Sequence, residues 1–174
     1  MHIKPVAVLA FFWLASSAAY GGETPVDPWK PLQFLIGTWE AKTQGGAAKA
    51  EGSGTYTFQL ELHNHILARH SSSEACKGPA DFNCEHGDLL YVYREAAGQA
   101  YKAIYFDNEG HVIRYEVTAP SASTAMFLSD PSSPGPQFRL VYSLDGSIMS
   151  GKFQMRMPGK TEFKSYLEWS GAKR

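Results

Sequence analysis

The chain has 174 residues, 44% of them apolar and 19% charged, and 16 basic residues against 17 acidic ones give a net charge of −1. This length fits one domain with its own core, and the apolar content is too high for an intrinsically disordered chain. The lack of a basic excess argues against a nucleic-acid-binding protein, because no surplus of cations is present to neutralise phosphates. The 16 glycines and 13% aromatic residues favour β-structure with many turns.

The first segment of the chain has the pattern of an export signal. Lys4 precedes an apolar run at residues 6–15, and small residues lead to a cleavage site of the type Ala19-Tyr20-Gly21. This order predicts a secretory signal peptide over residues 1–21, and therefore a secreted or periplasmic protein. A transmembrane helix needs about 20 apolar residues, so the run is too short and no integral membrane protein is expected.

Strand signals dominate the rest of the chain. Residues 22–33 are polar and proline-rich and predict an extended lead-in, with one helical turn that starts at Pro31. Residues 54–62 then alternate apolar and polar side chains, which is the period of a half-buried strand. Similar segments follow along the chain and predict a series of strands at residues 37–43, 54–62, 65–73, 88–95, 101–106, 111–118, 124–129, 138–144, 148–155 and 163–169.

Turn sequences separate several of these segments. His63-Asn64, residues 107–110 and Asp145-Gly146 are short enough to join neighbouring antiparallel strands. Sequential antiparallel strands form a meander, and closing a long meander leaves no unpaired edge. We therefore predict an all-β, antiparallel up-and-down barrel of about ten strands over residues 34–174. A two-sheet sandwich is the alternative.

The chain contains two cysteines, Cys76 and Cys84, separated by seven residues. In an oxidising compartment this pair predicts a disulfide that closes a short loop. The alternative is a metal site that adds His70 and His86, since zinc binds two cysteines and two histidines. Zinc-binding cysteine pairs are usually closer in sequence, so we expect the disulfide and no metal.

The segment Phe34-Leu35-Ile36-Gly37-Thr38-Trp39 resembles the opening of calycin-type barrels. Lipocalins carry a Gly-x-Trp in their first strand, and nitrobindin-like haem-binding barrels carry a closer Leu-x-Gly-Thr-Trp segment. The resemblance implies a barrel with an apolar cavity, a carrier or sensor function, and structural roles for Gly37 and for Trp39 at the closed end. Nitrobindin-like proteins ligate haem through a histidine near the C-terminus, whereas the last histidine here is His111. Haem binding is therefore not carried over, and haem remains only an alternative cofactor.

Tyrosines and one histidine are the candidates for a ligand pocket. Within a strand at residues 111–116, His111 and Tyr115 face one way and Arg114 faces the other. If the tyrosines of the two preceding strands meet Tyr115 inside the barrel, they line a cavity with aromatic rings and a few hydroxyls. With the opposite register the same rings cover the outer face. The expected ligand-binding residues are Tyr91, Tyr93, Tyr105, His111, Tyr115 and Arg114.

Arginines also interrupt strand-like segments, at Arg69, Arg114 and Arg139. An inward arginine needs a carboxylate partner because an unpaired buried charge is very costly. Glu116 and Glu168 are available as partners. Exposed positions are the favoured interpretation, and an inward arginine would indicate an anionic head group such as that of a fatty acid.

Catalytic motifs are absent from the sequence. The phosphate-loop-like residues 146–152 are followed by Phe153 where serine or threonine is needed. His63 and His65 are expected in a solvated turn rather than at a metal. We therefore predict an exported protein that binds a small, largely apolar or amphipathic molecule, and we do not expect an enzyme. The alternatives are an enzyme with His111 as general base, a haem- or porphyrin-binding barrel, and a solid interaction module.

Overall fold

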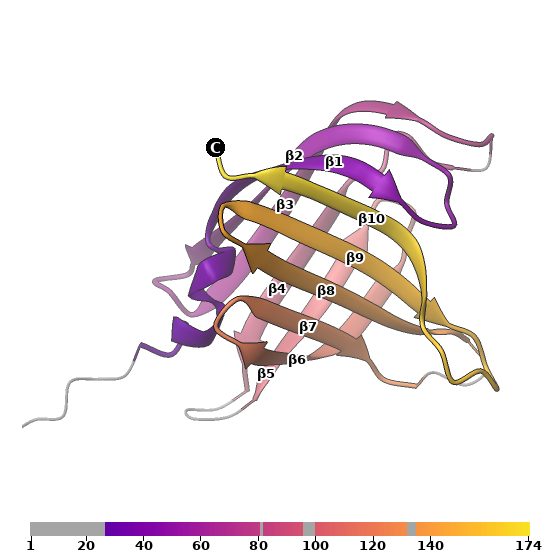
Figure 1. The fold of residues 1–174 in the computed structure, drawn as a ribbon. Coiled ribbons are helices and arrows are strands. Elements are labelled where there is room, and N and C mark those ends of the chain that lie inside the picture. The colour runs from indigo at the N-terminus through magenta and orange to yellow at the C-terminus, as the bar shows by residue number, and fades with distance from the viewer. Residues whose placement is uncertain (1–26, 81, 96–99, 132–134) are drawn as a thin grey trace, which may run out of the picture.

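The computed structural model describes residues 27–80, 82–95, 100–131 and 135–174 (Figure 1). The expected signal peptide lies outside the described residues. A short 3-10 helix precedes the strands, and no helix in the described ranges is long and apolar enough to cross a membrane. The elements are η1 (Lys30–Leu35), β1 (Gly37–Gly45), β2 (Glu51–Glu61), β3 (Ile66–Lys77), β4 (Asp88–Arg94), β5 (Tyr101–Asp107), β6 (Val112–Ser121), β7 (Thr124–Ser129), β8 (Gln137–Asp145), β9 (Ile148–Arg156) and β10 (Lys164–Ala172).

The ten strands form one closed antiparallel barrel. Each strand pairs with its neighbours in the sequence, and β10 pairs with β1 to complete the ring (Figure 1). The prediction of an all-β up-and-down barrel is confirmed, and the sandwich alternative is wrong because the sheet closes on itself. Closure gives every strand a partner on both sides, so no strand forms a free edge of the sheet along its whole length.

The barrel interior is filled by every second side chain of the strands. On β4, Leu90 and Val92 are fully buried, and on β2 Phe58 is fully buried. Several strands are longer than predicted, and among them β2 begins at Glu51 and β3 ends at Lys77. The extra residues of these two strands pair with each other in a hairpin extension, and their sequence, with few large apolar side chains, shows no apolar alternation.

One end of the barrel is closed by η1. The helix has a proline, Pro31, within its first turn, where the missing N–H costs no hydrogen bond. Leu32 and Leu35 point into the core and are fully buried. The indole Nε1 of Trp39 donates to the Leu35 carbonyl oxygen at 2.8 Å. The tryptophan of the Gly-x-Trp segment therefore lies buried beneath the helix that closes this end.

A glycine lets the C-terminus cross this tryptophan. Gly37 has a φ of +133°, and a Cβ added there would lie 2.3 Å from the Lys173 side chain. The Lys173 ammonium lies 5.5 Å from the centroid of the Trp39 ring, within the range of a cation–π contact. Glycine adopts this positive φ without strain, and its lack of a side chain leaves room for Lys173.

The β2–β3 turn at the closed end has an unusual backbone. Leu62, His63 and Asn64 have φ values of 50°, 53° and 66°, and this left-handed region costs a non-glycine residue roughly 1–2 kcal/mol. Leu62 leaves the apolar stripe of β2 and is 68% exposed, contrary to the alternation that the sequence predicts for it. The indole of Trp29 donates to the Asn64 carbonyl oxygen at 2.7 Å, so the turn is held against the lead-in.

Replacing Leu62 by glycine is expected to raise the free energy of unfolding by about 0.5–1 kcal/mol. Glycine accepts a positive φ without strain, and this gain exceeds the entropy that glycine adds to the unfolded chain. Urea denaturation followed by tryptophan fluorescence measures the difference. The control is Gly146→Ala, where φ is +57° and no atom lies within 4 Å of an added Cβ; this change should destabilise by about 1 kcal/mol. A less stable Leu62→Gly variant would contradict the assignment of strain to this turn.

Candidate functional site

A hollow of about 190 Å³ lies at the end of the barrel opposite η1. Its walls come from the end of β1, the start of β2, the end of β3, the start of β4, the middle of β10 and the loop before β4. The accessible lining is predominantly apolar, and Ala41, Phe82 and Leu167 contribute to it. A mostly apolar cavity with a few convergent polar groups is typical of small-molecule sites.

Aromatic residues form one wall of this hollow. Trp169 on β10 pairs with Gly151 on β9, and a Cβ at Gly151 would lie 2.2 Å from the indole. The glycine therefore leaves the space that the indole occupies. The fully buried Tyr142 ring lies 5.9 Å from the Trp169 ring and 5.8 Å from the Tyr56 ring. Tyr142 is thus the centre of the aromatic cluster beside the hollow.

A buried ion pair lies next to these rings. Arg69 on β3 is 5% exposed, because it pairs across the sheet with the inward-facing Phe58. Its Nη2 donates to Asp88 Oδ1, and its Nη1 donates to the Tyr142 hydroxyl oxygen. The favoured interpretation of Arg69 as exposed is therefore wrong. Its carboxylate partner is the first residue of β4.

The electrostatics of the pair keep both groups charged. Burial favours the neutral form of Asp88, yet the Arg69 guanidinium and the His86 imidazole hold its pKa well below the usual range. Burial likewise opposes the charge on Arg69, yet the Asp88 carboxylate raises the pKa of the guanidinium. Burial raises the pKa of Tyr56 and of Tyr142. At neutral pH both phenols therefore carry their proton.

His86 links this pair to the rim of the barrel. Its Nε2 lies 3.4 Å from Asp88 Oδ2 and 3.0 Å from the Tyr105 hydroxyl, and its Nδ1 lies 2.8 Å from Glu109 Oε1. The contact with Asp88, followed by that with Glu109, raises the pKa of His86 to about 9. The imidazole is therefore protonated at neutral pH, and both ring nitrogens donate.

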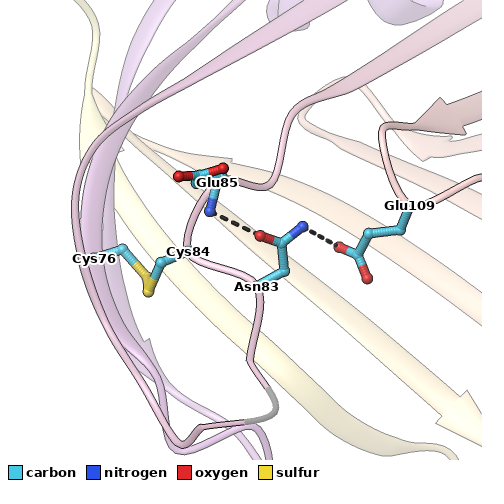
Figure 2. Close-up of a disulfide and its surroundings, with 5 residues drawn as sticks. All are labelled: Cys76, Asn83, Cys84, Glu85 and Glu109. Carbon is cyan, nitrogen blue, oxygen red and sulfur yellow. Dashed lines mark hydrogen bonds between the residues drawn. A yellow bond between two sulfur atoms is a disulfide. The ribbon is translucent and has the colours of Figure 1, made fainter.

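The disulfide holds this rim in place (Figure 2). Cys76 and Cys84 are bonded, which confirms the predicted pairing. Asn83, beside Cys84, accepts from the Glu85 backbone N–H at 2.9 Å and donates to Glu109 at 3.1 Å, as the dashed lines of Figure 2 show. The loop that carries His86 is therefore fixed both by a covalent bond and by the carboxylate that His86 contacts.

The raised pKa of His86 predicts a dependence of stability on pH. The folded state binds this proton more tightly than the unfolded chain, so the stabilisation is complete below about pH 6.5 and is lost as pH rises through about 9. Because the side chain is 36% exposed, solvent screening limits the loss to about 1 kcal/mol. Urea unfolding between pH 6 and 9.5 measures it. The decrease of the unfolding free energy with pH should be smaller in Glu109→Gln and absent in His86→Gln. An undiminished decrease in His86→Gln would show that it does not come from His86.

The structure also bears on the proposed metal ligands. The sulfurs of Cys76 and Cys84 bond each other, so the alternative zinc site that includes them is wrong. In the described part of the chain, His86, Asp107 and Glu109 bring potential ligand atoms within 4.8 Å of one another at the rim. Within this cluster, the protonated imidazole of His86 pairs with the Glu109 carboxylate.

The sequence-predicted ligand residues fall into three groups. Tyr105 and Tyr115 face the interior, and Tyr115 is buried. Tyr91, Tyr93 and Arg114 alternate with buried residues and lie on the outer face, so the structure does not bring them to the interior. His111 is exposed in the β5–β6 turn, where its Nδ1 pairs with Asp107 at 2.9 Å. None of the six predicted residues lines the hollow. The lining residues are Ala41, Thr43, Ala50, Glu51, Gly52, Ser53, Gly54, Thr55, Tyr56, Arg69, Ser71, Ser72, Ser73, Ala75, Cys76, Phe82, Asn83, Cys84, His86, Asp88, Leu167 and Trp169.

The histidines in the described part of the chain do not fit a haem ligand. His63, His65 and His111 are exposed. His70 lies on the outer face of β3 and contacts Glu61 at 2.9 Å. Both ring nitrogens of His86 already have partners, Glu109 at Nδ1 and Asp88 and Tyr105 at Nε2. The described residues therefore place no free imidazole nitrogen in the interior.

Comparison with protein-family models finds no family that matches this chain. Comparison with curated proteins finds no match either. The closed ten-stranded antiparallel barrel is consistent with a calycin-like fold.

Proposed function

We propose that this protein is an exported carrier or sensor that binds a small amphipathic molecule in the hollow of a calycin-like barrel. One observation carries the proposal. The barrel is sealed by η1 at one end and keeps a mostly apolar hollow with convergent polar side chains at the other. Such a hollow removes the apolar part of a ligand from water, while the polar groups orient its other end.

The proposed export is supported by two independent features. The Cys76–Cys84 disulfide is of a kind that persists in oxidising compartments. The N-terminal residues 1–21 have the charged, apolar and small-residue order of a secretory signal peptide. We infer a secreted or periplasmic protein from the two together.

Neither His111 nor His86 is suited to the enzymatic alternative. His111, the expected general base, is exposed and outside the hollow. His86 lines the hollow, but its pKa of about 9 keeps it protonated at neutral pH, so it does not accept a proton there. We therefore propose no catalytic step.

The proposal is tested by filling the hollow. Ala41 packs against the core and lines the hollow, so Ala41→Phe should weaken binding of the dye 1-anilinonaphthalene-8-sulfonate by about tenfold or more. Gln44→Phe, on the same strand but exposed, is the matched control and should bind as the unaltered protein does. Mass spectrometry of an organic extract of the exported protein looks for a natural ligand. An empty extract, together with dye binding that Ala41→Phe leaves unchanged in a folded protein, would overturn the proposed function.

A further inference from the structure

Three buried polar atoms have no hydrogen-bond partner in the part of the chain that the structure describes. They are Tyr56 Oη, Arg69 Nε and Trp169 Nε1. All three residues line the hollow. Buried polar groups are nearly always paired with protein or ordered water, and each exception needs an explanation. Three exceptions around one hollow indicate that a further molecule completes them.

The three atoms are grouped around Tyr142. The Tyr142 ring is 5.8 Å from the Tyr56 ring and 5.9 Å from the Trp169 ring, and its hydroxyl accepts from Arg69. Burial raises the pKa of Tyr56 and the nearby Trp169 indole N–H acts in the opposite direction, so the two groups are close together, although no hydrogen bond of normal geometry joins them. The three side chains therefore surround one small region of the hollow.

All three groups are able to act as hydrogen-bond donors. The Nε–H of arginine and the indole N–H of tryptophan are donors only. Burial raises the pKa of Tyr56, so its hydroxyl keeps the proton and is able to donate it. The complement of three donors is a group with several lone pairs and no need to donate, and a carboxylate offers about four acceptor sites.

The charges favour an anion over a neutral acceptor. Arg69 and His86 are both cations in the lining of the hollow, and they share one buried carboxylate, Asp88. The other carboxylate on His86 is Glu109, at the exposed rim; Asp107, in the same cluster, pairs with His111, and the remaining acid of the lining, Glu51, is exposed. An added carboxylate would therefore form charge-assisted hydrogen bonds, which are stronger than those to neutral acceptors.

We propose that the hollow takes the carboxylate of a small amphipathic organic acid, held by Arg69 Nε, Trp169 Nε1 and the Tyr56 hydroxyl. This inference rests on the proposed binding function and specifies its ligand class. Water does not reach any of the three atoms in the structure, so their side chains shift towards the acid as it enters the hollow. The apolar part of the acid lies against Ala41, Leu167 or Phe82, which line the same hollow.

The size of the hollow sets the scale of the ligand. A cavity of about 150 Å³ holds a benzene molecule, and this one has about 190 Å³ and opens to solvent. One ring, or a chain of similar volume, fits inside, and a longer tail reaches outward through the open end. Suitable probes are phenylacetate and octanoate, each compared with the neutral primary amide of the same shape, phenylacetamide and octanamide.

The test is calorimetric titration of the exported, disulfide-bonded protein with these four compounds. Each acid should bind about tenfold or more tightly than its neutral counterpart. Tyr56→Phe, which keeps the ring, should weaken binding of the acids about five- to tenfold and binding of the neutral compounds less than about twofold. Arg69→Lys keeps the charge beside Asp88 but removes Nε–H, and it should weaken the acids similarly. Tyr115→Phe is the control, because Tyr115 is buried in the barrel but does not line the hollow.

The possible outcomes separate this inference from the proposed function. Equal binding of acids and neutral compounds would overturn the carboxylate assignment and leave the binding function standing. Acid-selective binding that Tyr56→Phe and Arg69→Lys both leave unchanged in folded protein would place the carboxylate elsewhere and also overturn the assignment. If none of the four compounds binds and the dye fails as well, both proposals are wrong.

Discussion

Asp88→Asn is expected to lower the free energy of unfolding by about 3–5 kcal/mol, because it leaves the Arg69 guanidinium buried without its counter-ion. Arg69 is 5% exposed and the Asp88 side chain 11%, so water cannot replace the lost partner. Urea unfolding at pH 7 measures the change. The control is Glu116→Gln, which breaks the exposed pair with Lys102; exposed pairs contribute about 0–1 kcal/mol. Similar losses in the two variants would contradict a buried, uncompensated charge.

The double variant Arg69→Met with Asp88→Leu separates stability from function. Replacing both charges by apolar residues of similar size is often neutral or stabilising in proteins. We expect the double variant to recover most of the stability that Asp88→Asn loses. It should nevertheless lose acid-selective binding, because it has neither the Arg69 donor nor the cation. Retained selectivity would indicate that the pair is structural only.

The strand series was predictable because burial acts on alternate residues. In β4, Leu90 and Val92 point inward while Tyr91 and Tyr93 point outward, and this period of two is visible in the sequence. The sequence does not say which face of a strand meets the core when one face carries aliphatic side chains and the other carries tyrosine rings. For this reason the sequence analysis places the tyrosines of β4 in a pocket, whereas the structure places them on the outer face.

The inward position of Arg69 had a signal in the sequence. The predicted turn at His63-Asn64 pairs residues symmetrically about itself and sets Arg69 opposite Phe58, as the structure does. Residues directly opposite each other share a face of the sheet, and Phe58 is in the apolar stripe. The sequence therefore contained the orientation of Arg69, whereas its pairing with Asp88 depends on the closure of β3 on β4.

The two remaining donors could not be found from local patterns. Tyr56 belongs to the apolar stripe of its strand, and the sequence pattern does not distinguish it from the core residues of that stripe. Trp169 reaches the hollow because β10 meets both β1 and β9 in the closed ring, and because Gly151 is opposite it. Both facts concern residues far apart in the chain. A site assembled by barrel closure appears only when the register of every strand is known.

Removal of the disulfide by Cys76→Ser with Cys84→Ser is expected to lower the free energy of unfolding by about 2–3 kcal/mol. The bond closes a loop with a sequence separation of 8, and in the chain-entropy model a loop of this size stabilises by about that amount. Urea unfolding with and without dithiothreitol measures the effect. Reductant should destabilise the unaltered protein to the level of the double variant and leave the double variant unchanged. An equal effect of reductant on both proteins would exclude the disulfide as its origin.

The same bond is expected to control ligand binding through the rim. Cys84 lies between Asn83 and His86, and these side chains hold Glu109 on one side of the hollow. Without the bond, ordering this loop adds a conformational cost to binding. The acids should therefore bind less tightly to the reduced protein, while Asp88 remains paired with Arg69 inside the barrel. Unchanged affinity after reduction would show that the strands alone shape the site and that the loop contributes only to stability.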